Sequence, residues 1–347
     1  MAKTTLQELL QTRPWLLADG ATGTNLFDMG LMSGDAPELW NMDPEHSHKI
    51  STLHRKFVEA GADIILTNTF GGGAYRLKLH NLQDQVFEIN KAAGELARAE
   101  ADAVDRPVVV AGSVGPTGEI FQPVGELAYE DGVAAFTEQA KGLKAGGVDV
   151  LWIETMSAED EYRAAVEGCA TTGLPIVGTM SFDTNGRTMM GITPEHFANF
   201  TADIPNGPIA VGANCGTGAS ELLTTVLGIA KARPDAIVVA KANCGIPEYK
   251  EGAIQYSGTK ELMADYARMA LDAGARIIGG CCGTSYDHLA AMRVALEAHE
   301  KRAAPTIEQV IEKLGEVSEM AKNIGCGHAH HAPKSARPGT RRRRKAS

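Results

Sequence analysis

The feature that most constrains the fold is a repeated alternation of short apolar runs and longer helical patterns along most of the chain. Eight runs have the length and residue types of buried strands, and helical periodicity fills most of the intervals between them. Near-continuous apolar strands indicate a parallel sheet covered by helices. The expected strands are residues 16–20, 63–70, 107–115, 148–155, 175–181, 209–215, 236–241 and 275–280.

Eight strand–helix units are the number that closes a TIM (β/α)8 barrel, whose functional residues lie at the carboxyl ends of the strands. The alternative, an open doubly wound sheet, would need a glycine-rich nucleotide loop after an early strand. Residues 19–24 (DGATGT) match that fingerprint poorly. We therefore predict one α/β domain, a TIM barrel over residues 1–303, followed by a short helix over 304–325 that could pack on the barrel or contact another copy.

The distribution of charge argues against nucleic acid as the main partner. Residues 333–347 hold seven of the 33 basic residues and no acidic one, so residues 1–332 carry 26 basic against 43 acidic side chains. We expect residues 326–347 to form a disordered tail, although it could touch an anionic surface. Cys326 and the nearby His328, His330 and His331 could bind metal, but a flexible His-rich tract often has no specific role.

The chain lacks the signals of a membrane or secreted protein. No apolar run reaches the ~18–20 residues of a membrane span. The N-terminal residues lack the basic-then-apolar pattern of a signal peptide. Six cysteines in 347 residues are too sparse for a disulfide scaffold. These features predict a cytoplasmic protein whose cysteines are buried thiols or metal ligands.

Two adjacent cysteines stand in a glycine frame at the end of the eighth expected strand. Neighbouring side chains of a regular strand point to opposite faces, so Cys281 and Cys282 serve one site only if the flanking glycines bend the backbone. Cys215 ends the sixth expected strand. Three thiolates at one barrel mouth would make a zinc site with an open fourth position. A strained vicinal disulfide would also fit the pair, but it leaves Cys215 unexplained.

Polar residues end several other expected strands, where a TIM barrel keeps its chemistry. Glu154 directly follows three apolar residues, and an acid there is costly unless it is paired or solvated. That cost favours a functional role for Glu154. Asp19 could instead cap the following turn. The full set at the strand ends is Asp19, Asn68, Thr69, Ser113, Glu154 and Asn214, in addition to the three cysteines.

Six motifs, in this order, make the chain resemble the homocysteine S-methyltransferase family. That family includes the homocysteine-binding module of cobalamin-dependent methionine synthase, betaine–homocysteine methyltransferase and S-methylmethionine-dependent enzymes. The two cysteine motifs together are highly specific, whereas the glycine motifs alone would be weak. The motifs are residues 19–24 (DGATGT), 67–70 (TNTF), 112–116 (GSVGP), 154–155 (ET), 212–215 (GANC) and 279–284 (GGCCGT).

The resemblance implies a zinc-bearing TIM barrel that methylates homocysteine to methionine. It implies that Cys215, Cys281 and Cys282 hold Zn²⁺, with the sulfur of the substrate as fourth ligand. Cys244 lies in a similar stretch, residues 242–245 (ANCG), where the family has an Asn-Ala-Gly type of turn. We therefore leave Cys244 out of the metal set.

The resemblance also implies how the amino acid part of homocysteine is held. The acidic contacts of the family to the amino group suggest Glu154 and Asp19. Backbone near Gly20 and around Asn68 and Thr69 would hold the carboxylate. No general base is required beyond the metal, so the main task of the protein would be orientation.

The methyl donor stays open at this stage. A betaine enzyme must hold a quaternary ammonium, usually between aromatic faces, and betaine-dependent relatives have aromatic residues where this chain has Gly71 and Thr155. Trp40 and Tyr75 could supply a different cage, although ordinary packing also explains them. The residues beside Glu154 and the cysteine pair look more like the methionine-synthase module.

That likeness favours a methylcorrinoid, delivered by a separate corrinoid- or folate-binding protein because this chain is too short to carry such domains. Betaine or S-methylmethionine as donor are the alternatives. Another thiol or a selenol could replace homocysteine as acceptor. A zinc-binding scaffold subunit without catalysis is the alternative of another class.

Overall fold

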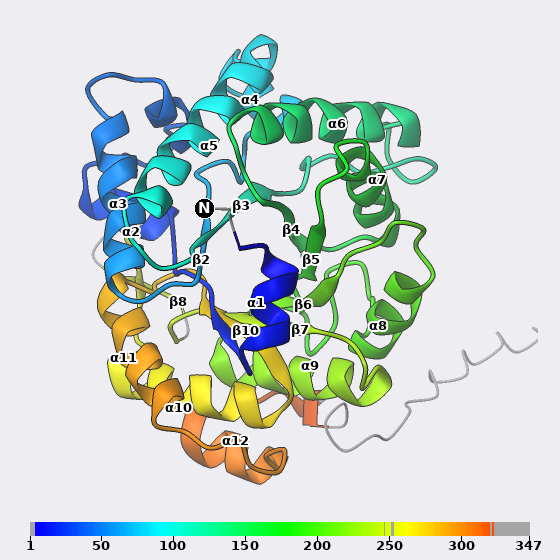
Figure 1. Ribbon diagram of the computed structural model, residues 1–347. Helices are drawn as coiled ribbons and strands as arrows, with labels where there is room; N and C mark the ends of the chain where they lie inside the picture. The colour runs from blue at the N-terminus through cyan, green and yellow to red at the C-terminus, as the bar shows by residue number, and fades with distance from the viewer. Residues whose placement is uncertain (1–3, 246, 251–252, 320, 323–347) are drawn as a thin grey trace, which may run out of the picture.

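A computed structural model of the protein describes residues 4–245, 247–250, 253–319 and 321–322, and its main sheet is an eight-stranded parallel barrel (Figure 1). The predicted TIM barrel is therefore confirmed. The barrel strands are β1 (Leu16–Leu17), β2 (Ile64–Leu66), β3 (Val109–Val114), β4 (Val150–Met156), β5 (Ile176–Met180), β6 (Ala210–Cys215), β7 (Val238–Ala242) and β10 (Ala275–Gly280).

The strands follow one another around the ring in the order β1-β10-β7-β6-β5-β4-β3-β2. The ring closes between β1 and β2, where Asp63 N donates to Leu17 O and Asp19 N donates to Ile64 O, at 2.7 and 2.9 Å. Every strand of the ring points the same way, so all of its carboxyl ends open at one mouth.

Helices cover the outside of the barrel, and several of them end at glycines in the left-handed region that glycine adopts readily, as α3 and α10 do. The glycines of these two helices are Gly61 and Gly274, with φ of +101° and +105°. The helices are α1 (Leu6–Thr12), α2 (Gly23–Asp28), α3 (Ser47–Glu59), α4 (Ala74–Lys78), α5 (Val86–Asp102), α6 (Tyr129–Ala145), α7 (Glu159–Ala170), α8 (Pro194–Ala202), α9 (Ala219–Ala232), α10 (Lys260–Asp272), α11 (Tyr286–Glu297) and α12 (Ile307–Leu314), with 3-10 helices η1 (Pro37–Asn41) and η2 (Gln83–Gln85).

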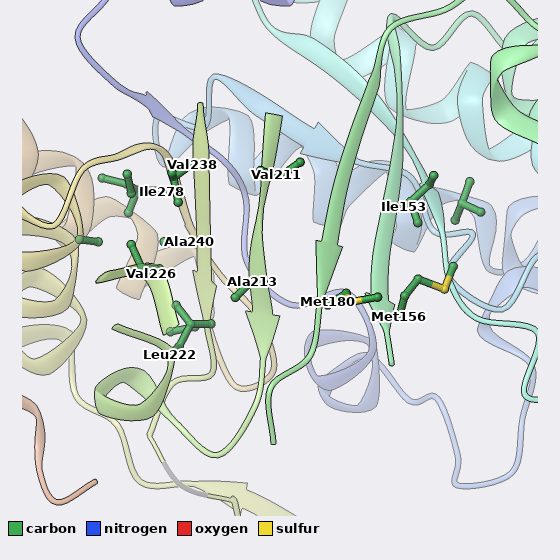
Figure 2. Close-up of a cluster of buried hydrophobic side chains, with 14 of the residues drawn as sticks. Ile153, Met156, Met180, Val211, Ala213, Leu222, Val226, Val238, Ala240 and Ile278 are labelled. Atoms are coloured by element: carbon green, nitrogen blue, oxygen red, sulfur yellow. The ribbon is translucent and has the colours of Figure 1, made fainter. Parts of the chain in front are cut away.

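Alternating strand residues form two cores. On β4, Val150 and Trp152 pack inside the barrel, whereas Leu151 and Ile153 pack between the sheet and the helices. Figure 2 shows part of the outer core, with side chains of several strands facing α9. Helix α1 packs leucines on the inner core and closes the amino-terminal end of the barrel (Figure 1). The opposite end is the mouth.

Two features differ from the sequence prediction. A hairpin of β8 (Pro247–Lys250) and β9 (Ala253–Tyr256) follows β7 and was not predicted, because its residues are too polar to resemble a buried strand. Within the range predicted as a helix over 304–325, α12 is shorter and ends before Gly315, whose φ of +102° interrupts the helix. The predicted tail, residues 326–347 with Cys326 and its three histidines, lies outside the described residues.

Among the helices that the structure describes, none combines the length and the apolar character needed to cross a membrane.

Candidate metal and substrate site

The structure places the predicted site residues around the barrel mouth. Asp19 follows β1, Asn68 and Thr69 follow β2, and Ser113 lies near the end of β3. The remaining ones come from the other half of the ring: Glu154 from β4, Asn214 and Cys215 from β6, and Cys281 and Cys282 from the residues after β10.

The sulfur atoms of Cys215, Cys281 and Cys282 all lie within 4.8 Å of one another, and in the described residues these three form the only group of metal-ligand side chains this compact. The sulfur of Cys215 is 2.9 Å from that of Cys281 and 3.9 Å from that of Cys282. Two thiolates on a tetrahedral zinc lie about 3.8 Å apart, given Zn–S bonds of about 2.3 Å. The donor set therefore fits a zinc ion after the closer pair separates by about 1 Å.

The backbone explains how two neighbouring cysteines reach one site. Strand β10 ends at Gly280, and Thr284 N then donates to Cys281 O at 3.1 Å in a turn. Gly283 in this turn has a φ of +77°. Both cysteines are free thiols, so the alternative of a vicinal disulfide is not what the structure has.

Cys215 also depends on unusual backbone, since its φ of +58° lies in the left-handed region that non-glycine residues rarely adopt. Asn243, after β7, connects the two cysteine segments. Its Oδ1 accepts from Cys282 N at 3.0 Å, and its Nδ2 donates at 2.6 Å to the carbonyl of Gly216, next to Cys215. This asparagine fixes the spacing of the cysteines from the side of β7.

Mutual hydrogen bonds make the three thiols unequal. Hydrogen bonds from Cys215 and Cys281 lower the pKa of Cys282 to about 3, while the same pairing raises the pKa of Cys215 well above its usual range. The group therefore holds one thiolate stabilised by two thiols. A bound cation would be needed to keep all three sulfurs deprotonated.

Cys244 is a buried thiol beside this group. Its backbone is hydrogen-bonded to the turn that carries Cys281 and Cys282, called here the metal-side turn. Its N–H donates to Cys282 O at 2.9 Å, and burial raises the pKa of its thiol to about 11. Cys244 is not one of the three clustered cysteines. Its role in the structure is to pack and to carry these backbone bonds.

Glu154 reaches the mouth because β4 contains a bulge. Ile153 pairs with Gly178 of β5 and Met156 pairs with Met180, so Glu154 and Thr155 together oppose one residue. The carboxylate is 8% exposed and accepts a hydrogen bond from Ser113 Oγ at 2.5 Å. Burial raises its pKa to about 7. A cationic group bound at the mouth would stabilise the ionised form of Glu154 and so lower its pKa.

Asp19 forms an internal ion pair with Lys241 of β7. Lys241 Nζ lies 2.7 Å from Asp19 Oδ1, and Leu66 N donates to Asp19 Oδ2 at 2.7 Å. Both side chains are almost fully buried. Burial alone would lower the pKa of Lys241, but the carboxylates of Asp19 and Glu154 outweigh it and raise the pKa. Burial raises the pKa of Asp19, and the charge of Lys241 and the N–H of Leu66 oppose that shift. Lys241 Nζ lies over the ring of Trp152, 5.6 Å from its centroid.

The side chains of Asn68 and Thr69 hold neighbouring loops in place. Asn68 Nδ2 donates to Pro37 O at 2.8 Å and to Asn41 Oδ1 at 3.1 Å, which ties η1 to the end of β2. Thr69 Oγ1 donates to Ser113 O at 2.7 Å. Because both side chains are hydrogen-bonded within the protein, the backbone around Asn68 and Thr69 is what remains available for the predicted contact with the substrate carboxylate.

Gly20 is required by close packing after β1. A Cβ atom there would lie 2.5 Å from Thr284 O and 2.9 Å from the ring of Phe57. Any side chain at position 20 would therefore push the β1 segment away from the turn that carries the cysteine pair.

Sequence reasoning missed three residues that shape the site. Lys241 is the one that the sequence could have revealed, because it is a charged residue at the end of an otherwise apolar strand. Asn243 gave no signal of its own. Tyr256, from the unpredicted hairpin, packs its ring against Gly283, in the turn that carries the cysteine pair.

The two aromatic residues considered for a cation cage are engaged in packing. The ring of Trp40 stacks on His46 at 4.5 Å between centroids, and Lys49 Nζ lies 4.7 Å from its centroid. Tyr75 is partly buried against the outer core. The ring of His46 and the ammonium group of Lys49 already contact the Trp40 ring, so Trp40 is not a free aromatic wall.

Comparison with known proteins gives one family. The family model described as homocysteine S-methyltransferase matches residues 16–296. Methionine synthase from Mycobacterium leprae (strain TN) is 29% identical over 331 residues, an alignment that covers 91% of this chain. The chain spans only 27% of the length of that relative.

Solved structures give the same picture. The homocysteine methyltransferase MmuM from Escherichia coli, in an oxidised and in a metallated form, superposes with a TM-score of 0.69 and 25% identity. These alignments cover 83% of this chain and 98% and 99% of the two MmuM chains.

Proposed function

This chain belongs to the homocysteine S-methyltransferase family and is therefore a methyltransferase, and we propose that it transfers a methyl group to the sulfur of homocysteine, forming methionine, with zinc as cofactor. The observation that carries the proposal is the cluster of Cys215, Cys281 and Cys282 at the same mouth as the buried Glu154. The metallated form of the E. coli homocysteine methyltransferase supports a metal in this fold.

The cysteines would hold the ion at the mouth, and the open fourth position would face the substrate. When bound, zinc lowers the pKa of a coordinated thiol, so that the sulfur is a thiolate at neutral pH. Cys215, Cys281 and Cys282, as cysteinates, would offset the positive charge of the ion, so that a substrate sulfur held there would keep electron density for attack on a methyl group. The C–S bond forms as the bond from the methyl to its carrier breaks.

Glu154 is the proposed partner of the amino group of homocysteine. Its carboxylate is buried, and Ser113 holds one of its oxygens, so it is oriented before a substrate arrives. Backbone near Gly20 and around Asn68 and Thr69 is the proposed contact for the carboxylate. Asp19, predicted as a second acidic contact, would act mainly by keeping Lys241 in place beneath the site.

For the donor we propose a methylcorrinoid carried by a separate protein. Ten of the twelve exposed large apolar side chains among the described residues lie between a barrel strand and the next of the helices α3, α5, α6 and α8, in segments that include α2, η1 and α4. Such segments follow the carboxyl ends of the strands, on the side of the mouth. Such a rim suits a protein partner more than a small ionic donor. They are Phe27, Met32, Leu39, Met42, Phe70, Leu79, Ile120, Val124, Met189 and Met190.

A small-molecule donor such as betaine or S-methylmethionine is the second candidate. The observation in its favour is that the alignment covers 98% of the chain of the E. coli homocysteine methyltransferase, which leaves little of that chain for a separate donor-binding domain. Against betaine in particular, Trp40 is already stacked on His46, and position 71, which is aromatic in betaine-dependent relatives, is glycine in this chain.

The test is a donor panel on one preparation of the full chain with its zinc content measured. Homocysteine is supplied with methylcobalamin, betaine or S-methylmethionine, and methionine is quantified. We expect turnover with methylcobalamin, and turnover with betaine alone would overturn the proposed donor. If no donor works, calorimetry with homocysteine separates an enzyme lacking its partner from a scaffold subunit, which would not bind the amino acid.

The cytoplasmic location predicted from the sequence is part of this proposal. The five cysteines of the described residues are all free thiols, which fits a reducing compartment.

A further inference from the structure

Asn214, the residue before Cys215, is the most highly connected side chain at the mouth. It is 1% exposed, and its Oδ1 accepts hydrogen bonds from Thr155 N at 2.8 Å and from Thr179 Oγ1 at 2.6 Å. Its Nδ2 donates to Thr155 Oγ1 at 2.7 Å and lies 3.9 Å from Cys281 Sγ. One amide thus contacts β4, β5 and the metal-side turn.

The contact with β4 supports strained backbone. Thr155 has a φ of +63°, which is unfavourable for a β-branched residue and persists only where the surroundings hold it. Asn214 binds both the N–H and the hydroxyl of Thr155. Because Thr155 directly follows Glu154 in the bulge, the amide of Asn214 also determines where the carboxylate of Glu154 points.

The Asn214 amide also contacts Cys281, on the opposite side of the mouth from Thr155. An N–H donor at 3.9 Å from a sulfur orients that sulfur and is suited to a thiolate acceptor. Asn214 is also bonded through the chain to Cys215, whose φ of +58° sets the direction of a second sulfur. The buried amide of Asn214 therefore helps to fix the positions of two of the three sulfurs and of the carboxylate of Glu154.

We propose that Asn214 is a positioning residue that sets the chain length of the thiol amino acid the site accepts. The inference rests on the proposed function, since it takes the cysteine cluster as the anchor for sulfur and Glu154 as the anchor for the amino group. Homocysteine has one methylene more than cysteine between these groups. When both anchors are rigid, one methylene changes affinity by about 10–200-fold.

The experiment measures dissociation constants for homocysteine and for cysteine by calorimetry on the zinc-loaded full chain, so no methyl donor is needed. Wild type is expected to prefer homocysteine by at least about tenfold. Asn214→Ala removes all the contacts, and the preference should fall to about threefold or less. Asn214→Asp keeps the acceptor for Thr155 N but loses the amide donors, and its preference should be intermediate.

Thr201→Val serves as a matched control. It removes a buried hydroxyl that donates to Phe197 O at 2.8 Å within α8, away from the mouth. We expect this variant to keep the wild-type preference even if it is less stable. If the role of Asn214 were purely structural, its variants would bind homocysteine and cysteine more weakly by the same factor. The ratio of the two dissociation constants would then stay unchanged.

The inference is overturned if wild type discriminates and both Asn214 variants keep the wild-type ratio. Where Asn214→Ala does not fold, the ratio of Asn214→Asp decides alone. Failure of the proposed function looks different, because wild type would then bind neither homocysteine nor cysteine.

Discussion

The two halves of the mouth are built in different ways. The metal half, formed by the ends of β6, β7 and β10, depends on turns, with left-handed backbone at Cys215 and Gly283. The recognition half, formed by β1 to β4, depends on buried side chains such as Asp19 and Glu154, each of which has a hydrogen-bond partner within the protein. The metal half places three thiols against one another, and the proposed zinc ion would complete it. In the recognition half, the buried acids already have partners within the protein.

This difference has consequences for mutation. Removing a sulfur should abolish metal binding while the barrel stays folded. Removing a charge from the recognition half should leave its partner buried and alone, so it should affect stability as well as substrate binding.

The largest effect is expected in the metal half, from Cys282→Ala. Two sulfurs cannot complete the zinc site, and loss of metal assistance removes several kcal/mol, so methyl transfer should fall by roughly a thousandfold or more. Zinc content and methionine formation measure it. Cys244→Ala is the matched control, a buried neighbouring thiol outside the cluster, and should retain zinc. Full activity of Cys282→Ala would contradict the metal assignment.

The next effect is on stability, from Lys241→Met on β7, whose side chain pairs across the mouth with Asp19 of the recognition half. The change leaves Asp19 buried without its cation, which costs about 3–5 kcal/mol. Urea unfolding of the metal-free protein measures it. The double variant with Asp19→Asn should recover much of the loss, because no uncompensated charge stays behind. A single variant as stable as wild type would show that the ion pair is not what holds this region.

Glu154→Gln should act on substrate binding with less effect on the barrel. A hydrogen bond to a charged group is worth about 1.5–3 kcal/mol, so the affinity for homocysteine should fall by about 10–150-fold. The affinity for a desamino thiol, 4-mercaptobutanoate, should not change, because it lacks the group that Glu154 binds. Equal losses for both ligands would count against Glu154 as the amino-group contact.

The smallest effect is the dependence on pH. Burial raises the pKa of Glu154 to about 7, so homocysteine affinity should rise as pH increases through that value, by up to tenfold per unit below it. The sign is opposite for stability. The folded state binds this proton more tightly, so the contribution of Glu154 is fully present below pH 4.5 and is lost as pH rises through about 7. Homocysteine affinity and stability are measured as a function of pH for wild type and for Glu154→Gln. The difference between the two proteins isolates both effects.

The strand pattern predicted the barrel, and the placement of the cysteines at two strand ends predicted that they would meet. That inference works because parallel strands of a barrel carry their carboxyl ends to one mouth, whatever the sequence between them. Glu154 could be predicted for the same reason. The early end of β1 at Leu17, within the predicted strand over residues 16–20, and the exact helix ends could not be predicted, because they depend on tertiary hydrogen bonds.

The role of Asp19 shows where this reasoning stops. Its partner Lys241 lies 222 residues away in the chain, and no local pattern links the two. The contacts of Asn214 with Thr155 and Thr179 span 59 and 35 residues, and no local pattern predicts them either.

The sequence by itself determined the barrel, the three cysteines and the acid of β4, because strand periodicity and strand-end position are local properties that the barrel converts into proximity. Only the tertiary structure decided how these groups are held. The bulge of β4, the buried ion pair of Asp19 and Lys241, and the amide of Asn214 each join segments far apart in the chain. Such contacts exist because buried polar groups must find partners, and the folded barrel selects which ones they find.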